Sequence, residues 1–236
     1  EPLAVRITTS SVELAPTGDL AAAGGIGKPS TASLTVVVDY EDPATSATTT
    51  VDFSGDGRMS LVASSGCGVV FVHTISAASA SGCLNQASFT VTARVAFGGA
   101  VGTLASTPRT VSLVRFESLA LRLDAFPSGP SGVSVLSRVQ CTADTYQRAR
   151  PAVSASLSNG EVYNVTDEVT YETSDSSKVR LDGAGFGAVA HGEAVGSARI
   201  TARLHGAAST TADLAVVSSV AGIDSITLST ASTTLY

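Results

Sequence analysis

Two six-residue segments decide the fold of this chain, namely Phe89-Thr90-Val91-Thr92-Ala93-Arg94 and Ala198-Arg199-Ile200-Thr201-Ala202-Arg203. They begin 109 residues apart, and apolar residues alternate with polar ones in both. A period of two places the apolar side chains on one face, which is typical of a half-buried β-strand. Each segment is followed by a glycine turn, at Gly98-Gly99 and at Gly206, and then by a short apolar strand. The pattern predicts one structural unit that occurs twice.

Other segments extend the repeat in both directions. The matching pairs are 110–114 with 213–217, 50–54 with 168–172, and 59–62 with 178–181. A strand of similar composition opens each unit, at 3–7, 119–123 and 223–228. There are three opening strands, but only two are followed by a complete set of further strands. This predicts a domain at 1–114, a domain at 115–217, and a segment at 218–236 that holds a linker and the first strand of a third, truncated repeat. Because a lone apolar strand is unstable in water, we expect the chain to continue into that repeat; insertion of the strand into a neighbouring molecule is the alternative.

The composition predicts an all-β fold of tandem immunoglobulin-like sandwiches. Hydrophobic residues make up 44% of the chain, yet aromatic residues are only 5%, Trp is absent and Gly occurs 22 times. Small and β-branched residues favour strands and turns, and about seven short strands per ~110 residues are typical of a two-sheet sandwich. No apolar run approaches the ~20 residues of a spanning helix, so we expect no direct membrane insertion in this segment. The net charge of -6 argues against a nucleic-acid partner.

The second unit resembles the bacterial immunoglobulin-like domain of the Big2 type, which is found in invasin-like and intimin-like proteins. The matching elements are Ser158-Asn159-Gly160, Val165-Thr166, Val169-Thr170-Tyr171, Thr173-Ser174-Asp175, Gly183 to Gly187, and Gly196-Ser197-Ala198-Arg199-Ile200-Thr201-Ala202. The resemblance covers roughly residues 150–217. The first unit matches only at its two ends, because residues 62–88 depart from the pattern with an insertion that carries two Cys. The resemblance implies a repeat of a long extracellular or cell-surface protein, where such domains serve as stalks, spacers and adhesive tips.

Three cysteines carry the main covalent chemistry that the sequence offers. Cys67 and Cys83 lie in the same inserted segment, and we expect them to form a disulfide within the first domain; two reduced core thiols are the alternative. A disulfide indicates an oxidising compartment. Cys141 is then left over, and it is interpreted as a buried free thiol or as part of an intermolecular or interdomain bridge. Zinc needs four ligands, so we expect no metal site at these cysteines.

Asn164-Val165-Thr166 is an N-glycosylation sequon, which makes Asn164 a candidate glycan site. Other motifs are interpreted as structural elements rather than as ligand-binding sites. The run from Asp52 to Gly57 is similar to half of a calcium loop, but a turn is preferred because Ala63 stands where the loop needs Glu. Asp39, Glu41 and Asp42 are interpreted as a solvated strand end rather than a calcium site. The glycine-rich run 183–188 is expected to be a hairpin, because no helix follows it to bind a phosphate.

The sequence contains no recognisable catalytic constellation, since its three histidines are far apart and none has Ser/His/Asp or metal spacing. We therefore expect no enzymatic activity and no cofactor. The leading hypothesis is a structural segment of a larger extracellular protein: a stalk, a spacer, or a subunit of a filament or surface coat, for example of the flagellar-hair type. Its expected partners are neighbouring domains of the same parent chain, further copies of itself, or another surface protein. A cell-adhesion module that binds a glycan or a protein receptor ranks second, and an accessory part of a secreted enzyme third.

Overall fold

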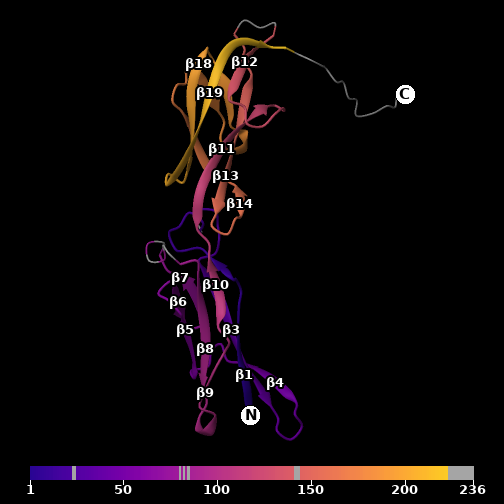
Figure 1. The fold of residues 1–236 in the computed structure, drawn as a ribbon, viewed down its shortest axis with the longest axis vertical. Helices are drawn as coiled ribbons and strands as arrows, with labels where there is room; N and C mark the ends of the chain where they lie inside the picture. Colours follow the sequence, from indigo (N-terminus) through magenta and orange to yellow (C-terminus); the bar gives the residue numbers. More distant parts are fainter. Residues whose placement is uncertain (23–24, 80, 82, 84–85, 141–143, 223–236) are drawn as a thin grey trace, which may run out of the picture. The chain divides into compact units, whose positions relative to one another are not determined.

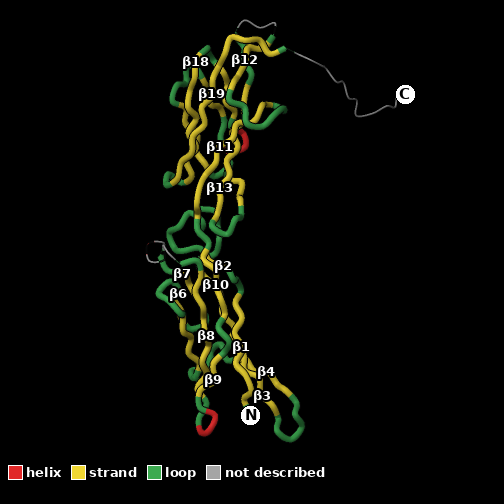
Figure 2. Tube along the Cα trace, viewed as in Figure 1, coloured by secondary structure: helices red, strands yellow, loops and turns green. Residues whose placement is uncertain are grey.

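The computed structural model describes residues 1–22, 25–79, 81, 83, 86–140 and 144–222. Nearly all regular structure in these residues is β-strand, and the helical segments are the short 3₁₀ turns η2 (Gly99–Val101) and η3 (Gly185–Gly187) (Figure 2). The chain divides into two compact units. The first consists of Glu1–Ser118 and Ser156–Tyr163, and the second consists of Leu119–Ala155 and Asn164–Tyr236. The prediction of tandem all-β immunoglobulin-like sandwiches is confirmed.

Two sheets face each other in the first unit (Figure 1). One has the strand order β1 (Pro2–Thr9), β3 (Thr31–Glu41), β7 (Thr74–Ala77), β6 (Gly68–Phe71), with β4 (Thr48–Asp52) also paired to β3. The other has the order β2 (Glu13–Leu14), β10 (Arg109–Leu113), β8 (Ser88–Ala96), β5 (Met59–Ala63), with β9 (Thr103–Ala105) also paired to β8.

The strands from β11 onward repeat this topology. One sheet has the order β11 (Phe116–Phe126), β13 (Arg148–Leu157), β17 (Val189–Gly192), β16 (Val179–Asp182), with β14 (Val162–Asn164) also paired to β13. The other has the order β12 (Val135–Val139), β19 (Ala208–Ala221), β18 (Gly196–Leu204), β15 (Val169–Thr173). In both halves a short strand near the start pairs in parallel with the last strand, β2 with β10 and β12 with β19.

The duplicated topology corrects part of the alignment made from the sequence. The segments at 89–94 and 198–203 do lie in equivalent strands, β8 and β18. The match of 50–54 with 168–172 is wrong, because β4 pairs with β3 in one sheet whereas β15 pairs with β18 in the other. The match of 59–62 with 178–181 is wrong in the same way, since β5 pairs with β8 whereas β16 pairs with β17. Short alternating strands look alike in sequence, and only their pairing partners separate them.

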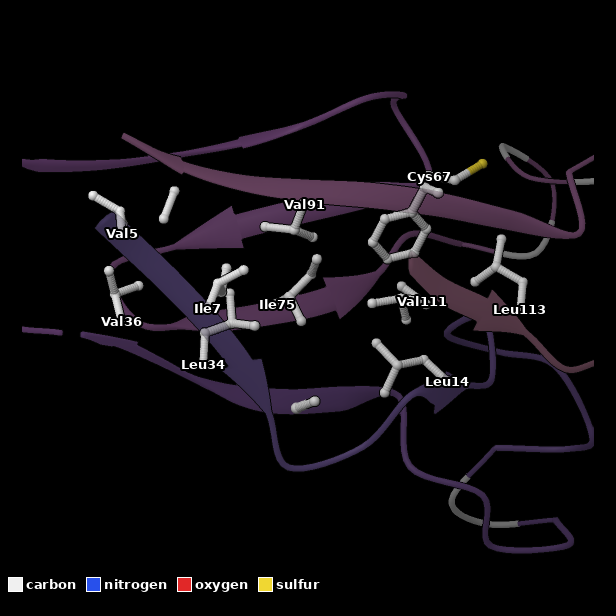
Figure 3. Close-up of a cluster of buried hydrophobic side chains, with 14 of the residues drawn as sticks. Val5, Ile7, Leu14, Leu34, Val36, Cys67, Ile75, Val91, Val111 and Leu113 are labelled. Atoms are coloured by element: carbon white, nitrogen blue, oxygen red, sulfur yellow. The ribbon is translucent and has the colours of Figure 1, made fainter. Parts of the chain in front are cut away.

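Strict alternation builds the core of each unit. In β3 the side chains of Ala32, Leu34, Val36 and Val38 are buried while their neighbours are exposed or half-buried. They pack against side chains from the facing sheet, and Figure 3 shows Leu34 and Val36 in the same cluster as Val91. The second unit has a separate core, formed by Leu123, Leu136, Ala149, Val179, Ala190, Ala198, Ile200, Leu214 and Val216.

A smaller apolar cluster completes the first unit. Ala15, Ala21, Ala22, Val114 and Leu157 are buried together, with Ile26, Phe116 and Tyr163 packed against them. Leu157 and Tyr163 come from Ser156–Tyr163, where β13 ends and β14 begins. This segment is therefore part of the first unit's packing, although it is distant in sequence.

The end of the chain is described only in part. β19 runs to Ala221, so it includes the start of the segment that we expected to be a linker. Residues 223–236, the expected first strand of a third repeat, lie outside the described residues.

Candidate functional site

The two cysteines of the insertion come together in the structure. Cys67 precedes β6, Cys83 lies in the segment before β8, and the two are joined by a disulfide with a Cα–Cα distance of 5.4 Å. Both side chains are buried in the core of the first unit. Gly68, the next residue, packs so closely that a Cβ atom there would lie 2.6 Å from the Phe89 ring. The bond thus anchors the insertion to the core.

The other candidate residues named from sequence differ in what the structure adds. Cys141 lies outside the described residues. Asn164 ends β14 with an exposed side chain, and its Oδ1 accepts a hydrogen bond of 3.1 Å from the backbone N–H of Thr166. The Thr166 side chain is buried, and its Oγ1 accepts a 2.9 Å bond from the N–H of Val153. A glycan attaches through Nδ2, so glycosylation would leave the Oδ1 contact intact.

Three of the carboxylates singled out in the sequence, those of Asp39, Asp52 and Asp56, accept hydrogen bonds from nearby side chains. Asp52 accepts bonds from both the backbone N–H and the hydroxyl of Ser54, at 2.8 and 2.7 Å. Asp56 is held by Arg58, whose hydrogen bonds lower the pKa of that carboxyl to about 2. Asp39 pairs with Arg6 at 2.7 Å. No group of three or more His, Cys, Asp and Glu side chains suited to a metal ion occurs among the residues that the structure describes.

The histidines remain on separate elements. His73 lies in the turn between β6 and β7, and His205 follows β18. His191 in β17 has its Nε2 atom 3.4 Å from Asp182, and the Nε2 atom of His205 is 3.8 Å from Glu168. These contacts are surface pairs, and they do not form a nucleophile–base arrangement.

One feature of the second unit was not identified from sequence: two arginines stack on one aromatic ring. The guanidinium carbons of Arg148 and Arg150 lie 4.9 and 4.8 Å from the centroid of the Phe126 ring. The two arginines are two positions apart on β13, which puts both on the same exposed face of the sheet. The Arg-Ala-Arg spacing could have indicated a shared face, but the distant Phe126 could not have been found.

Most other described arginines instead pair with carboxylates. Such pairs join Arg6 to Asp39, Arg58 to Asp56, Arg122 to Asp124, Arg180 to Asp182 and Glu193, Arg199 to Asp213, and Arg203 to Glu172. Arg148 also lines an open groove of about 500 Å³ together with Phe126, Tyr146, His191 and Glu193. Guanidinium groups held on a ring keep their N–H edges available, so this face can accept an anionic group.

No described helix is long and apolar enough to cross a membrane. The sequence matches no protein-family model and no curated protein. Solved structures with a similar fold include domains 1–6 of the surface layer protein SbsC, with 17% identity, a TM-score of 0.53, and coverage of 94% of this chain. A crystal structure of the S-layer protein rSbsC(31-844) matches with the same identity and TM-score over 92% of this chain. A match to a C-terminal fragment of intimin, solved in complex with the intimin-binding domain of the translocated intimin receptor, covers 91% of this chain and 64% of the fragment, at 11% identity and a TM-score of 0.31.

The chain spans 28% of the length of the SbsC chains that it matches. At this level of identity the similarity is one of fold.

Proposed function

We propose that this chain is a non-enzymatic structural segment of a larger extracellular protein built from tandem immunoglobulin-like domains. In that role it serves as a stalk, a spacer, or a subunit of a filament or surface coat. The observation that carries the proposal is the duplicated strand order, in which two successive sandwiches are built on one plan. Repeating a small domain lengthens a protein without requiring a new fold. This suits a protein that spans distance rather than one that forms a catalytic centre.

Three further observations support this role. The described residues present carboxylates and histidines in local surface pairs, and none of these pairs has catalytic geometry. The Cys67–Cys83 disulfide suits an oxidising compartment outside the cytosol. The SbsC domains that share the fold belong to a surface layer protein. The proposal includes an immunoglobulin-like domain with a Cys-containing insertion at 1–114, a Big2-type domain at 115–217, and a third repeat that begins within 218–236.

Location is the direct test of this proposal. Antibodies raised against the chain should label intact cells of the source organism as strongly as permeabilised cells, and brief protease treatment of intact cells should remove the signal. Labelling only after permeabilisation would contradict the extracellular role. Deleting the repeats from the parent gene should shorten or thin the surface structure without loss of an enzymatic activity.

A second function, adhesion to a receptor, is favoured by the stacked pair of arginines on Phe126. The groups that such a surface would recognise are the carboxylates or sulfates of an acidic glycan or protein. Binding of the purified chain to immobilised acidic glycans, lost in Arg148→Ala/Arg150→Ala and retained in Arg199→Ala, would favour adhesion. Arg199 is a matched control because it is exposed and already paired with Asp213.

A further inference from the structure

The hairpins β3–β4 and β13–β14 are equivalent parts of the two repeats. At the base of the first hairpin, the backbone N–H of Val36 donates a hydrogen bond to the hydroxyl of Ser54 at 3.0 Å. At the base of the second, the N–H of Val153 donates to the hydroxyl of Thr166 at 2.9 Å. The same side-chain contact therefore marks corresponding residues in the two hairpins.

From these bonds the strand register matches three further positions towards the tips. The matched pairs are Tyr40 with Leu157, Thr49 with Glu161, and Val51 with Tyr163. In each hairpin these three side chains share one face, because they are opposite each other or two positions apart. Only the tips differ in length, with eight residues at 41–48 and three at 158–160.

This face of the second hairpin is packed. Leu157 is only 1% exposed and lies in the small apolar cluster of the first unit, with Tyr163 packed against that cluster. Glu161 binds Lys28 at 2.5 Å. The segment Ser156–Tyr163 is therefore part of the compact unit that comes before the second repeat in the chain.

The same face of the first hairpin is open to solvent. Val51 is 42% exposed, Thr49 is exposed, and so is the rest of β4. Tyr40 is half-buried, beside Phe53 and Phe97. A single exposed Val is ordinary on a protein surface. The contrast between two equivalent hairpins, one packed and one open within the described residues, is what indicates that a partner covers the first.

The chain also enters the two hairpins in the same way. The backbone N–H of Glu41 donates to the carbonyl of Glu1 at 2.8 Å, and the N–H of Ser158 donates to the carbonyl of Arg115 at 2.9 Å. Arg115 follows β10, the last strand of the first sandwich, by two residues. Glu1 thus holds the place that, in the second repeat, comes directly after a sandwich. Figure 1 shows β4 at the same end of the first unit as the N-terminus.

We infer that the β3–β4 hairpin, through Tyr40, Thr49 and Val51, is the docking surface for an immunoglobulin-like domain that precedes residue 1 in the parent chain. The inference rests on the proposed function, because it requires a tandem array. The second repeat selects the occupant, since its own hairpin belongs to the unit before it in the chain.

The chemistry of the partner surface follows from the same comparison. The second hairpin is received by small apolar side chains, those of Ala15, Ala21, Ala22 and Val114. The preceding domain should present a similar apolar surface to Val51. Because Thr49 stands where the second hairpin has Glu161, that surface needs no counterpart of the Lys28 cation.

Hydrogen exchange in a longer piece of the parent protein tests the inference. A protein that begins one repeat before residue 1 is compared with residues 1–236 alone. The backbone amides of residues 41–51 should exchange more slowly by about tenfold or more in the longer protein, because docking covers them. Unchanged exchange would overturn the inference, and so would a parent chain in which no domain precedes residue 1.

A substitution then assigns the effect to the hairpin face. Val51→Lys should leave the melting temperature of residues 1–236 unchanged, since Val51 is exposed there, but in the longer protein it should restore fast exchange of residues 41–51. Val62→Lys is the matched control, because Val62 is 45% exposed on β5 in the other sheet, and it should keep exchange slow. Equal behaviour of the two variants would contradict docking on this face.

The second hairpin provides a reference within residues 1–236. Tyr163→Lys alters the position equivalent to Val51 where the receiving surface is present. It should lower the melting temperature of the first unit by about 4 °C or more, because it places a second cation beside Lys28 and the apolar cluster. A Tyr163→Lys variant as stable as the wild type would remove the precedent, and with it the inference.

Two further outcomes separate this inference from its alternatives. Oligomers of residues 1–236 that Val51→Lys dissociates would assign the hairpin to a second copy and overturn the choice of a preceding domain. Surface labelling of the parent protein is independent of hydrogen exchange. A parent protein labelled outside the cell, with unchanged exchange of residues 41–51, would leave the proposed function standing without this docking surface. Slowed exchange in a parent protein found only inside the cell would do the reverse.

Discussion

Within the first unit, the Nζ atom of Lys28 lies 2.5 Å from Oε2 of Glu161, although the two residues are far apart in the sequence. The same ammonium group is 3.1 Å from Glu13 and 5.7 Å from the centroid of the Tyr163 ring. Its side chain is only 14% exposed. The contacts tie Ser156–Tyr163 to the rest of the unit beside the small apolar cluster.

Replacing Lys28 should therefore destabilise the first unit. Lys28→Met keeps the length of the side chain but leaves Glu13 and Glu161 close together without a cation, which should lower the free energy of unfolding by about 1–3 kcal/mol. Urea unfolding followed by intrinsic Tyr fluorescence and circular dichroism measures the change. Arg109→Met is the control, because Arg109 is exposed on β10. Equal effects of the two substitutions would refute the role of the Lys28 contacts.

The same contacts predict a dependence on pH. Hydrogen bonds, the largest contribution being that of Lys28, lower the pKa of Glu161 to about 2, whereas a Glu in an unfolded chain titrates at about 4.3. A carboxyl with a depressed folded-state pKa stabilises the fold fully above the unfolded value, and this contribution is lost as the pH falls through the folded value. The difference in melting temperature between wild type and Glu161→Gln should thus be constant above about pH 5 and shrink towards pH 2. A melting-temperature difference that stays unchanged between about pH 5 and pH 2 would contradict this prediction. The same pH dependence in the control Glu117→Gln would also contradict it.

The disulfide should be present in the purified protein. Non-reducing peptide mapping is expected to give a Cys67–Cys83 linked pair, because the structure buries both residues at bonding distance. The double variant Cys67→Ser/Cys83→Ser should unfold more easily by about 3 kcal/mol, the entropy expected for closing a loop of this size. Recovery of both thiols in free form, or of either one joined to Cys141, would contradict the pairing.

Gly68 should not tolerate even one additional methyl group. Its Cβ would lie 2.6 Å from two carbons of the Phe89 ring and 3.0 Å from the Cβ of Ala63. Gly68→Ala should cost about 1–3 kcal/mol by overpacking. Two residues away, a Cβ atom on Gly66 would meet nothing within 4 Å beyond its chain neighbours, so Gly66→Ala should be close to neutral. Similar melting temperatures for the two variants would show that the ring moves freely.

Asn164 should carry a glycan when the chain is secreted from a host that performs N-glycosylation. Its side chain is exposed, and the Oδ1 contact with Thr166 does not involve the nitrogen that a glycan occupies. Intact mass before and after endoglycosidase treatment checks this. Thr166→Ser keeps the sequon and should retain the glycan, whereas Asn164→Gln should lose it. A wild type of unmodified mass would rule out the site.

Much of the fold could be predicted from sequence, because it depends on patterns that are local. Alternation at 89–94 and 198–203 identifies two strands and the face that each buries, since a period of two orients every side chain. The glycine turns and short spacings then limit the fold to a sandwich. The Cys67–Cys83 pairing was accessible for a similar reason, because both residues belong to one short insertion.

Tertiary structure alone decided which strand pairs with which. The segments at 50–54 and 168–172 share a pattern but lie in different sheets, because sheet membership depends on a partner strand that the segment itself does not encode. The stack of Arg148 and Arg150 on Phe126 and the contact of Lys28 with Glu161 have the same origin. Each joins residues that are distant in the chain, and the three-dimensional packing of the sheets is what brings their side chains within a few ångströms.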